Sequence, residues 1–117
     1  MDKRWLLVAA VLGLVVAWQL WRKHTADRID SAEAHRLVSA GARLIDVRTP
    51  AEFSAGHIEG ARNVPLQELP ARMGELGPRE DPLVLYCRSG RRSNLARTKL
   101  EAEGFTAVYD LGPMSAW

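Results

Sequence analysis

The single cysteine of this 117-residue chain stands in a segment rich in arginine. It opens the segment Cys87-Arg-Ser-Gly-Arg-Arg92, which follows the apolar run Leu83-Val-Leu-Tyr86 and precedes a helix that we expect to begin at Ser93 as its N-cap. Three arginines, the amides of a tight loop and the positive end of a helix all favour the thiolate, which is the nucleophilic form of cysteine. Gly90 lets the loop curl without a clash at Cβ. The segment therefore predicts a reactive nucleophile rather than a spectator thiol.

Cysteine count and charge exclude several classes of protein. One cysteine forms neither an intrachain disulfide framework nor a multi-cysteine metal site. Residues 1–28 carry five basic and two acidic side chains, whereas residues 29–117 carry eleven and twelve. Because the basic excess is confined to the first 28 residues, the rest of the chain lacks the net positive charge that is the main argument for a nucleic-acid partner.

The elements that must position the cysteine alternate between helix and strand. Helix starts are predicted at Asp30, with Glu33 in capping-box position, and at Thr49, with Pro50 and Glu52 after it. The remaining expected elements are strands over 44–47, 83–86 and 106–109 and helices over 66–73 and 93–103. This order predicts an α/β fold, a doubly wound parallel sheet with helices on both faces. Ligands bind at the carboxyl ends of such strands, where Cys87 stands.

Two motifs make the chain similar to the single-domain rhodanese family. They are Asp46-Val-Arg-Thr-Pro-Ala-Glu52-Phe-Ser-Ala-Gly56-His57-Ile58-Glu-Gly60-Ala61-Arg-Asn63-Val-Pro65 and the Cys87–Arg92 loop, and the likeness extends over residues 30–117. The resemblance implies transfer of sulfane sulfur through a cysteine persulfide. Thiosulfate or a protein persulfide is then the donor and cyanide or a thiol the acceptor. This chemistry requires no metal or organic cofactor, and we interpret His24 and His35 as solvated side chains.

The resemblance also implies site roles. Cys87 is the sulfur-accepting nucleophile, and the loop that cradles the persulfide consists of Arg88, Ser89, Gly90, Arg91 and Arg92. We expect structural support from Asp46, Arg48, Glu52 and His57. Asp46 and Arg48 are placed to pair, and the spacing of Arg48 and Glu52 also permits an ion pair. Contact of Arg48 with substrate and general-base catalysis by His57 are the alternative interpretations.

Loop length distinguishes a sulfurtransferase from the phosphatases and arsenate reductases of the same fold. Phosphatases and arsenate reductases of this fold cradle an oxyanion in Cys-x5-Arg, whereas here Arg92 closes a shorter Cys-x4-Arg ring and Ser93 stands in the sixth place. Non-enzymatic recognition modules of the family commonly lack the cysteine. A persulfide carrier for partner proteins needs the same loop as a thiosulfate enzyme, so the sequence leaves both open.

The N-terminal segment predicts one transmembrane helix. We divide the chain into a tail (1–4), an anchor (5–21), a linker (22–29) and the rhodanese-like domain (30–117). Trp5, Trp18 and Trp21 suit the two membrane interfaces, and cations flank the run. A buried core helix and a signal peptide cleaved after Ala17 are the alternatives. The predicted location is a cell membrane, crossed once. The three cations after the run, Arg22, Lys23 and Arg28, slightly favour a cytoplasmic domain, whereas the basic N-terminus argues the other way.

The end of the chain departs from the family pattern. Pro113 stands where a second glycine usually precedes the element Met114-Ser-Ala-Trp117. The sequence also stops at Trp117, where a further helix normally continues in the family. We therefore expect the final helix to be vestigial and one sheet face to be thinner, with the membrane or another subunit available as cover.

Overall fold

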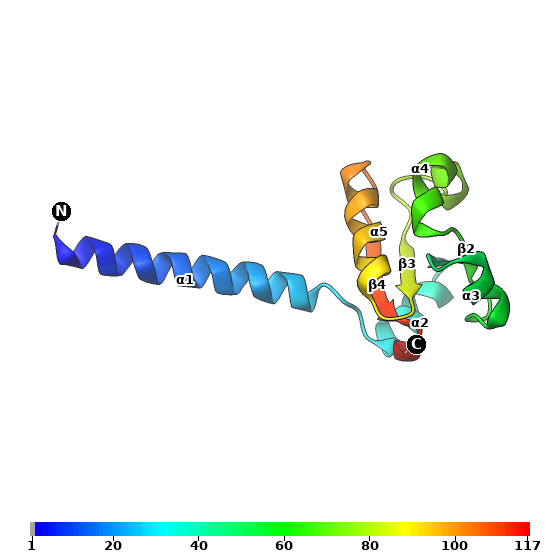
Figure 1. Ribbon diagram of the computed structural model, residues 1–117, viewed down its shortest axis with the longest axis horizontal. Helices are drawn as coiled ribbons and strands as arrows, with labels where there is room; N and C mark the ends of the chain where they lie inside the picture. The colour runs from blue at the N-terminus through cyan, green and yellow to red at the C-terminus, as the bar shows by residue number, and fades with distance from the viewer. Residues whose placement is uncertain (1) are drawn as a thin grey trace.

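A long N-terminal helix leads into a small α/β domain (Figure 1). The structure is a computed structural model that describes residues 2–117, with residues 21–26 described by their backbone alone. The helices are α1 (Lys3–Ala26), α2 (Ser31–Ser39), α3 (Pro50–Ala55), α4 (Leu69–Arg72) and α5 (Arg91–Ala102), and the 3-10 helices are η1 (Leu66–Glu68), η2 (Met73–Leu76) and η3 (Met114–Ala116). The strands are β1 (Arg43–Asp46), β2 (Arg62–Asn63), β3 (Leu83–Cys87) and β4 (Val108–Pro113).

The four strands form one parallel sheet in the order β2-β1-β3-β4. Successive side chains of β3 point to opposite faces, as strand geometry requires. Leu83, Leu85 and Cys87 join the core on one face, whereas Val84 and Tyr86 join the core on the other. The predicted parallel α/β architecture is confirmed, and the cysteine lies at the carboxyl end of a central strand.

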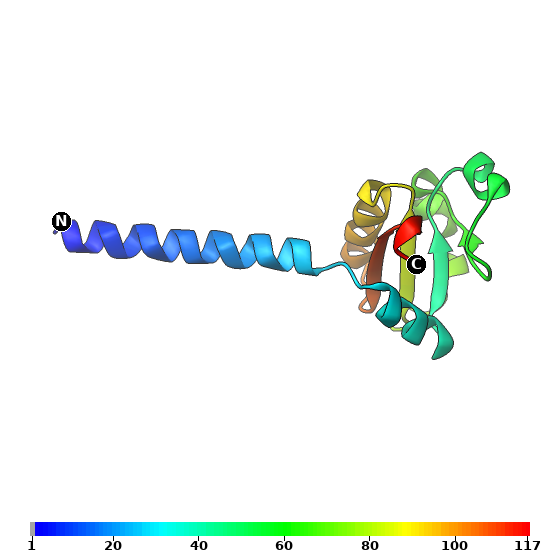
Figure 2. The ribbon, with the colours of Figure 1, turned by 90° about the horizontal axis from the view of Figure 1, so that it is seen from below.

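Helices cover both faces of this sheet, as predicted (Figure 2). On the face of Cys87, α4 contributes Leu69 and α5 contributes Ala96 and Leu100 to the core. The opposite face is covered by α2, through Ala34, and by the segment after β4, where Trp117 packs partly buried. Here the Ser31 hydroxyl donates to the Trp117 carbonyl over 2.9 Å, and the His35 and Trp117 rings lie 3.7 Å apart.

Two predicted helix starts are confirmed in detail. The Asp30 carboxylate accepts the Glu33 N–H at 2.9 Å at the start of α2. At the start of α3 the Thr49 hydroxyl accepts the Glu52 N–H, and the Glu52 carboxylate accepts the Thr49 N–H, which completes a capping box. Local side-chain chemistry therefore decides where these helices begin.

Other boundaries differ from the prediction. Helix α5 begins at Arg91 with Gly90 as its N-cap, so the expectation that Ser93 caps it is wrong. The helix expected over 66–73 is divided into η1, α4 and η2, where Pro70 and Gly74 weaken a continuous helix. The last strand runs over Val108–Pro113 rather than 106–109. Strand β2 was not predicted, because two residues show no alternation.

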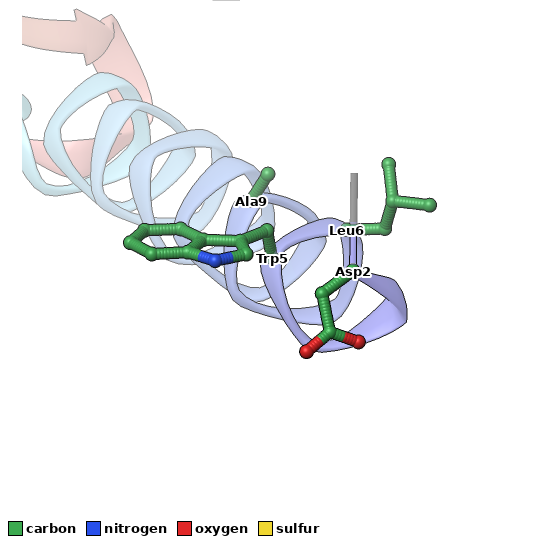
Figure 3. Close-up of a pocket in the computed structure, with 4 residues that line it drawn as sticks. All are labelled: Asp2, Trp5, Leu6 and Ala9. Atoms are coloured by element: carbon green, nitrogen blue, oxygen red, sulfur yellow. The ribbon is translucent and has the colours of Figure 1, made fainter.

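Helix α1 projects from the domain (Figures 1 and 2). The side chains of its residues 3–20 are exposed. Its segment Lys3–Leu20 is long and apolar enough to cross a membrane, judged by length and composition alone. Figure 3 shows Trp5, Leu6 and Ala9 extending outward from the first turns. The helix continues to Ala26, so the segment expected as a linker is helical over its first half. The side-chain roles expected of Trp21, Arg22, Lys23 and His24 lie outside the described residues.

Candidate active site

The sulfur atom of Cys87 lies buried beneath the loop that joins β3 to α5. Gly90 has a φ of +97°, a conformation that side chains rarely adopt, and this turn brings its N–H back onto the sulfur. The Gly90 N–H donates to Cys87 Sγ at 2.9 Å. A backbone dipole aimed at sulfur favours negative charge there. The loop therefore forms a compact site built around one sulfur atom.

Ser93 forms the second wall of this site. It is fully buried in the first turn of α5, its hydroxyl donates to the Gly90 carbonyl at 3.1 Å, and Cys87 Sγ lies 3.5 Å away. Sequence reasoning treated Ser93 as a helix cap and missed this contact. Ser93 follows the cysteine by six residues in a loop expected to curl back, and this spacing could have indicated the contact.

The three loop arginines have different surroundings. Arg88 and Arg91 are exposed and make no hydrogen bond or ion pair within the part of the chain that the structure describes. Arg92 instead forms a two-pronged ion pair with Glu52, with N···O distances of 2.6 and 2.9 Å. This pair raises the pKa of Arg92 and, with the Thr49 hydrogen bonds, lowers the pKa of Glu52 to about 2. Two free cations therefore stand at the surface of the loop, and a third ties the loop to α3.

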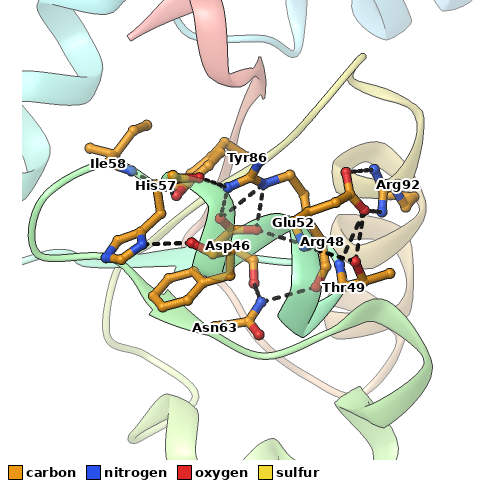
Figure 4. A network of polar contacts seen from close by, with 11 residues as sticks. Asp46, Arg48, Thr49, Glu52, His57, Ile58, Asn63, Tyr86 and Arg92 are labelled. Carbon is orange, nitrogen blue, oxygen red and sulfur yellow. Dashed lines mark hydrogen bonds and ion pairs between the residues drawn. The ribbon is translucent and has the colours of Figure 1, made fainter.

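Asp46 and Arg48 form a buried ion pair beside the loop (Figure 4). Arg48 Nη2 lies 2.7 Å from Asp46 Oδ2 and also donates to the Gly56 carbonyl at 2.7 Å. Bonding to Asp46 raises the pKa of Arg48. The expected Arg48–Glu52 pair is wrong, because Arg48 turns inward to Asp46 and leaves Glu52 to Arg92. These contacts hold the segment between β1 and α3 against the sheet.

Three further hydrogen bonds, formed by Asn63 and Tyr86, complete this network. The Asn63 side-chain amide donates to the backbone carbonyls of Asp46 and Arg48, at 3.0 and 2.9 Å. The Tyr86 hydroxyl accepts the Ile58 N–H at 3.1 Å, and burial raises the pKa of Tyr86 to about 12. Sequence reasoning placed Tyr86 in a strand but did not give it a partner.

His57 lies at the edge of the network in Figure 4. Its ring stacks on Phe53 with centroids 3.7 Å apart, and its Nδ1 lies 2.8 Å from the Phe53 carbonyl. No described contact joins it to Cys87 or to the loop arginines. This geometry favours support of the turn over proton transfer.

A cleft of about 300 Å³ adjoins the loop. Its lining combines Arg88 of the loop, the Arg48 and Glu52 side chains, Met114 from η3, and the end of α3 at Ala55 and Gly56. Sequence reasoning did not predict Ala55, Gly56 or Met114 there, because segments distant in sequence converge on it. Arg48, expected as structural support, also lines this cleft.

The cysteine loop and its surroundings have counterparts in known proteins. The family model described as "Rhodanese-like domain" matches residues 30–117. Thiosulfate sulfurtransferase 16 of Arabidopsis thaliana is 41% identical over 100 residues, covering 72% of this chain and 80% of that protein. Thiosulfate sulfurtransferase GlpE of Stutzerimonas stutzeri is 35% identical over 91 residues, covering 77% and 83%.

Solved structures agree with the sequence relatives. A rhodanese with anions from E. coli superposes with a TM-score of 0.63 at 32% identity, covering 66% of this chain and 92% of that one. The human single-domain sulfurtransferase gives a TM-score of 0.65 at 31% identity, covering 77% and 90%.

Proposed function

Because this chain belongs to the rhodanese-like family, we propose that it is a sulfurtransferase that carries sulfane sulfur on Cys87. Thiosulfate is the proposed donor, by analogy with the names of its relatives, and cyanide or a thiol is the acceptor. The observation that carries this proposal is the Gly90 N–H aimed at Cys87 Sγ over 2.9 Å. A donor of this kind stabilises anionic sulfur before and after transfer.

The proposed reaction has two displacements at sulfur. The Cys87 thiolate attacks the outer sulfur of thiosulfate, a new S–S bond forms, and sulfite leaves with the electron pair of the broken bond. The acceptor then attacks the terminal sulfur of the persulfide, and the electron pair returns to Cys87. Exposed Arg88 and Arg91 raise the local concentration of a dianionic donor near the loop.

Ring size supports sulfur over phosphate chemistry. The ring from Cys87 to Arg92 is one residue shorter than a Cys-x5-Arg oxyanion loop. Within it Arg92, the residue in the position of a ring-closing cation, is already paired with Glu52. A tetrahedral oxyanion needs several donors at about 2.7–3.1 Å from its oxygens, which favours a wider ring.

Intact mass spectrometry tests the proposal directly. After thiosulfate treatment, the full-length protein should gain one sulfur atom, about 32 Da, as expected for a covalent cysteine intermediate. Cys87→Ser should show no adduct and no sulfur transfer, whereas His57→Ala should retain transfer per folded molecule. Sulfur transfer by Cys87→Ser would refute the mechanism. Comparing thiosulfate with a protein persulfide as donor then distinguishes an enzyme from a carrier.

We also propose that α1 anchors the protein in a membrane and that the anchor remains attached. Its apolar segment is exposed along the whole of Lys3–Leu20, with none of that window buried. Apolar side chains exposed over a full span match a lipid environment rather than water.

A further inference from the structure

Arg28 stands between the anchor helix and α2, yet its backbone belongs to the domain. It forms a parallel bridge with Asp110 of β4, and the Ile29 N–H donates to the Asp110 carbonyl at 2.9 Å. The preceding residue, Asp27, is paired with Arg97 of α5 at 3.3 Å. These contacts fix the point from which the Arg28 side chain starts.

The Arg28 side chain covers two glycines with positive φ. These are Gly90 in the cysteine loop, at +97°, and Gly112 in β4, at +84°. A Cβ built on Gly112 would lie 3.1 Å from Arg28 Nε, and one on Gly90 would overlap the guanidinium group. The guanidinium therefore occupies the space that both glycines leave open.

A buried carboxylate faces the same guanidinium. Asp110 is wholly buried, and its Oδ1 accepts the Gly112 N–H at 2.8 Å. Its Oδ2 has no hydrogen-bond donor among the described side chains, and Arg28 Nε lies 4.0 Å from it. Because a buried charge is costly without an opposite charge nearby, Asp110 favours the placement of the Arg28 guanidinium over the two glycines.

These contacts lead to the reacting sulfur. Arg28 touches Gly90, and the Gly90 N–H is the donor to Cys87 Sγ. We propose that Arg28 is a positioning residue for sulfur transfer, held by Asp110 and keeping the Gly90 amide aimed at the Cys87 sulfur. This inference rests on the proposed function, and it gives Arg28, which the sequence suggested only as a charge flanking the anchor, a role in the site.

Four variants of the full-length chain in detergent micelles test this role. Arg28→Gln removes the charge, Arg28→Lys retains it, Asp110→Asn removes its partner, and Arg36→Gln is the control. Arg36 is an exposed arginine whose described partner is Glu33, on the same helix. Two quantities are measured: single-turnover sulfur transfer from thiosulfate, and amide hydrogen exchange of the peptide spanning residues 88–93.

Arg28→Gln should lower the transfer rate constant at saturating thiosulfate by about tenfold, because small displacements of reacting groups are costly. The half-saturating thiosulfate concentration should stay within about twofold, since Arg88 and Arg91 remain at the surface of the loop. Loop exchange should accelerate while exchange in the rest of the domain is unchanged. Arg28→Lys should recover most of the rate, and Arg36→Gln should match the wild type. Asp110→Asn should act in the same direction as Arg28→Gln, because it removes the charge that faces the guanidinium.

Wild-type transfer and wild-type loop exchange in Arg28→Gln would overturn the proposal. A uniform acceleration of exchange across the domain would also overturn it, because that result indicates general stabilisation only. If the wild-type protein transfers no sulfur, the proposed function fails, while loop exchange still shows whether Arg28 orders the loop.

Discussion

At the scale of single residues, the site depends on which partner each charged group takes. Arg48 pairs with Asp46 inside the fold, Arg92 pairs with Glu52, and Arg88 and Arg91 remain without a described partner. The ion pairs hold the backbone around the cysteine, and in the proposed reaction the two exposed arginines attract an anionic donor. One residue type therefore serves two purposes, separated by burial and by available carboxylates.

Protonation of Glu52 should destabilise the protein at acid pH. Its pKa is about 2 in the folded protein against 4.5 ordinarily, so its contribution to stability is complete above pH 4.5 and is lost as pH falls toward 2. We expect Glu52→Gln to lower the free energy of unfolding by about 1–2 kcal/mol at neutral pH, less than the full shift implies because both side chains are partly exposed. Denaturant unfolding in detergent at pH 7 and pH 3 measures this difference.

The loss caused by Glu52→Gln should be smaller at pH 3 than at pH 7. Glu33→Gln is the matched control, since Glu33 also forms a two-pronged pair, with Arg36, on an exposed helix face. An equal loss from Glu52→Gln at both pH values would contradict the role given to the Glu52–Arg92 pair.

At the scale of elements, the loop between β3 and α5 determines the surroundings of the cysteine sulfur. Its turn at Gly90 brings one N–H onto the sulfur, and the first turn of α5 brings the Ser93 hydroxyl alongside. Both contacts depend on the number of residues in the loop, because one added residue shifts Arg92 and Ser93 along the helix.

A glycine inserted after Gly90 should therefore abolish sulfur transfer. The insertion creates a Cys-x5-Arg ring and retains all three arginines, so lost charge would not explain the result. We expect sulfurtransferase activity to fall at least about 100-fold, as expected for misplaced reacting groups, with weak phosphate binding gained. The ratio of thiosulfate sulfurtransferase to aryl phosphatase activity, at equal folded concentration, is the measurement.

A glycine inserted after Glu80, in the exposed turn before β3, is the control and should leave that ratio unchanged. If the insertion after Gly90 also leaves it unchanged, ring size does not select the substrate.

Elements with strong local signals were predictable from the sequence. Asp30 and Thr49 start their helices through hydrogen bonds to residues three positions later, a spacing visible in the sequence. The apolar run before Cys87 is a buried strand. Strand β2 was missed because it consists of two residues held by pairing with β1. The start of α5 was misplaced because Ser93, a good cap by type, is buried against the sulfur while Gly90 caps the helix.

The part of the site that lies within one segment was predictable from the sequence. The contacts between segments distant in sequence were not. Cys87 and its loop are contiguous, whereas the Glu52–Arg92 pair joins residues 40 positions apart. From the sequence, Arg28 was grouped with the basic side chains of residues 1–28, since only the folded chain brings it to Gly90 and Asp110. Packing decides which distant residue each charged side chain pairs with, and composition and spacing alone do not reveal that packing.

At the scale of the whole molecule, α1 and the domain have opposite surface character. The window Lys3–Leu20 exposes its apolar side chains, whereas those of the domain lie mainly in two cores on either face of the sheet. Water favours the second arrangement and disfavours the first. The window Lys3–Leu20 is therefore suited to lipid, and the domain is suited to water.

Membrane extraction should show this division. We expect the full-length protein to remain in the membrane pellet after carbonate treatment and to have its full mass, since about 20 apolar residues suffice to span a bilayer. The same chain beginning at Asp27 should be recovered in the supernatant. A soluble product beginning near Trp18 would show cleavage of a signal peptide and contradict the anchor.

The short connection between α1 and α2 has a consequence for encounter rates. Only residues 27–30 separate the two helices, and the first two of these are fastened to α5 and β4. With α1 in a bilayer, the domain is confined to a thin layer beside the lipid, and its collisions with other proteins of that membrane occur in two dimensions. A thiol or persulfide partner in the same membrane would thus meet Cys87 far more often than an equally abundant soluble one.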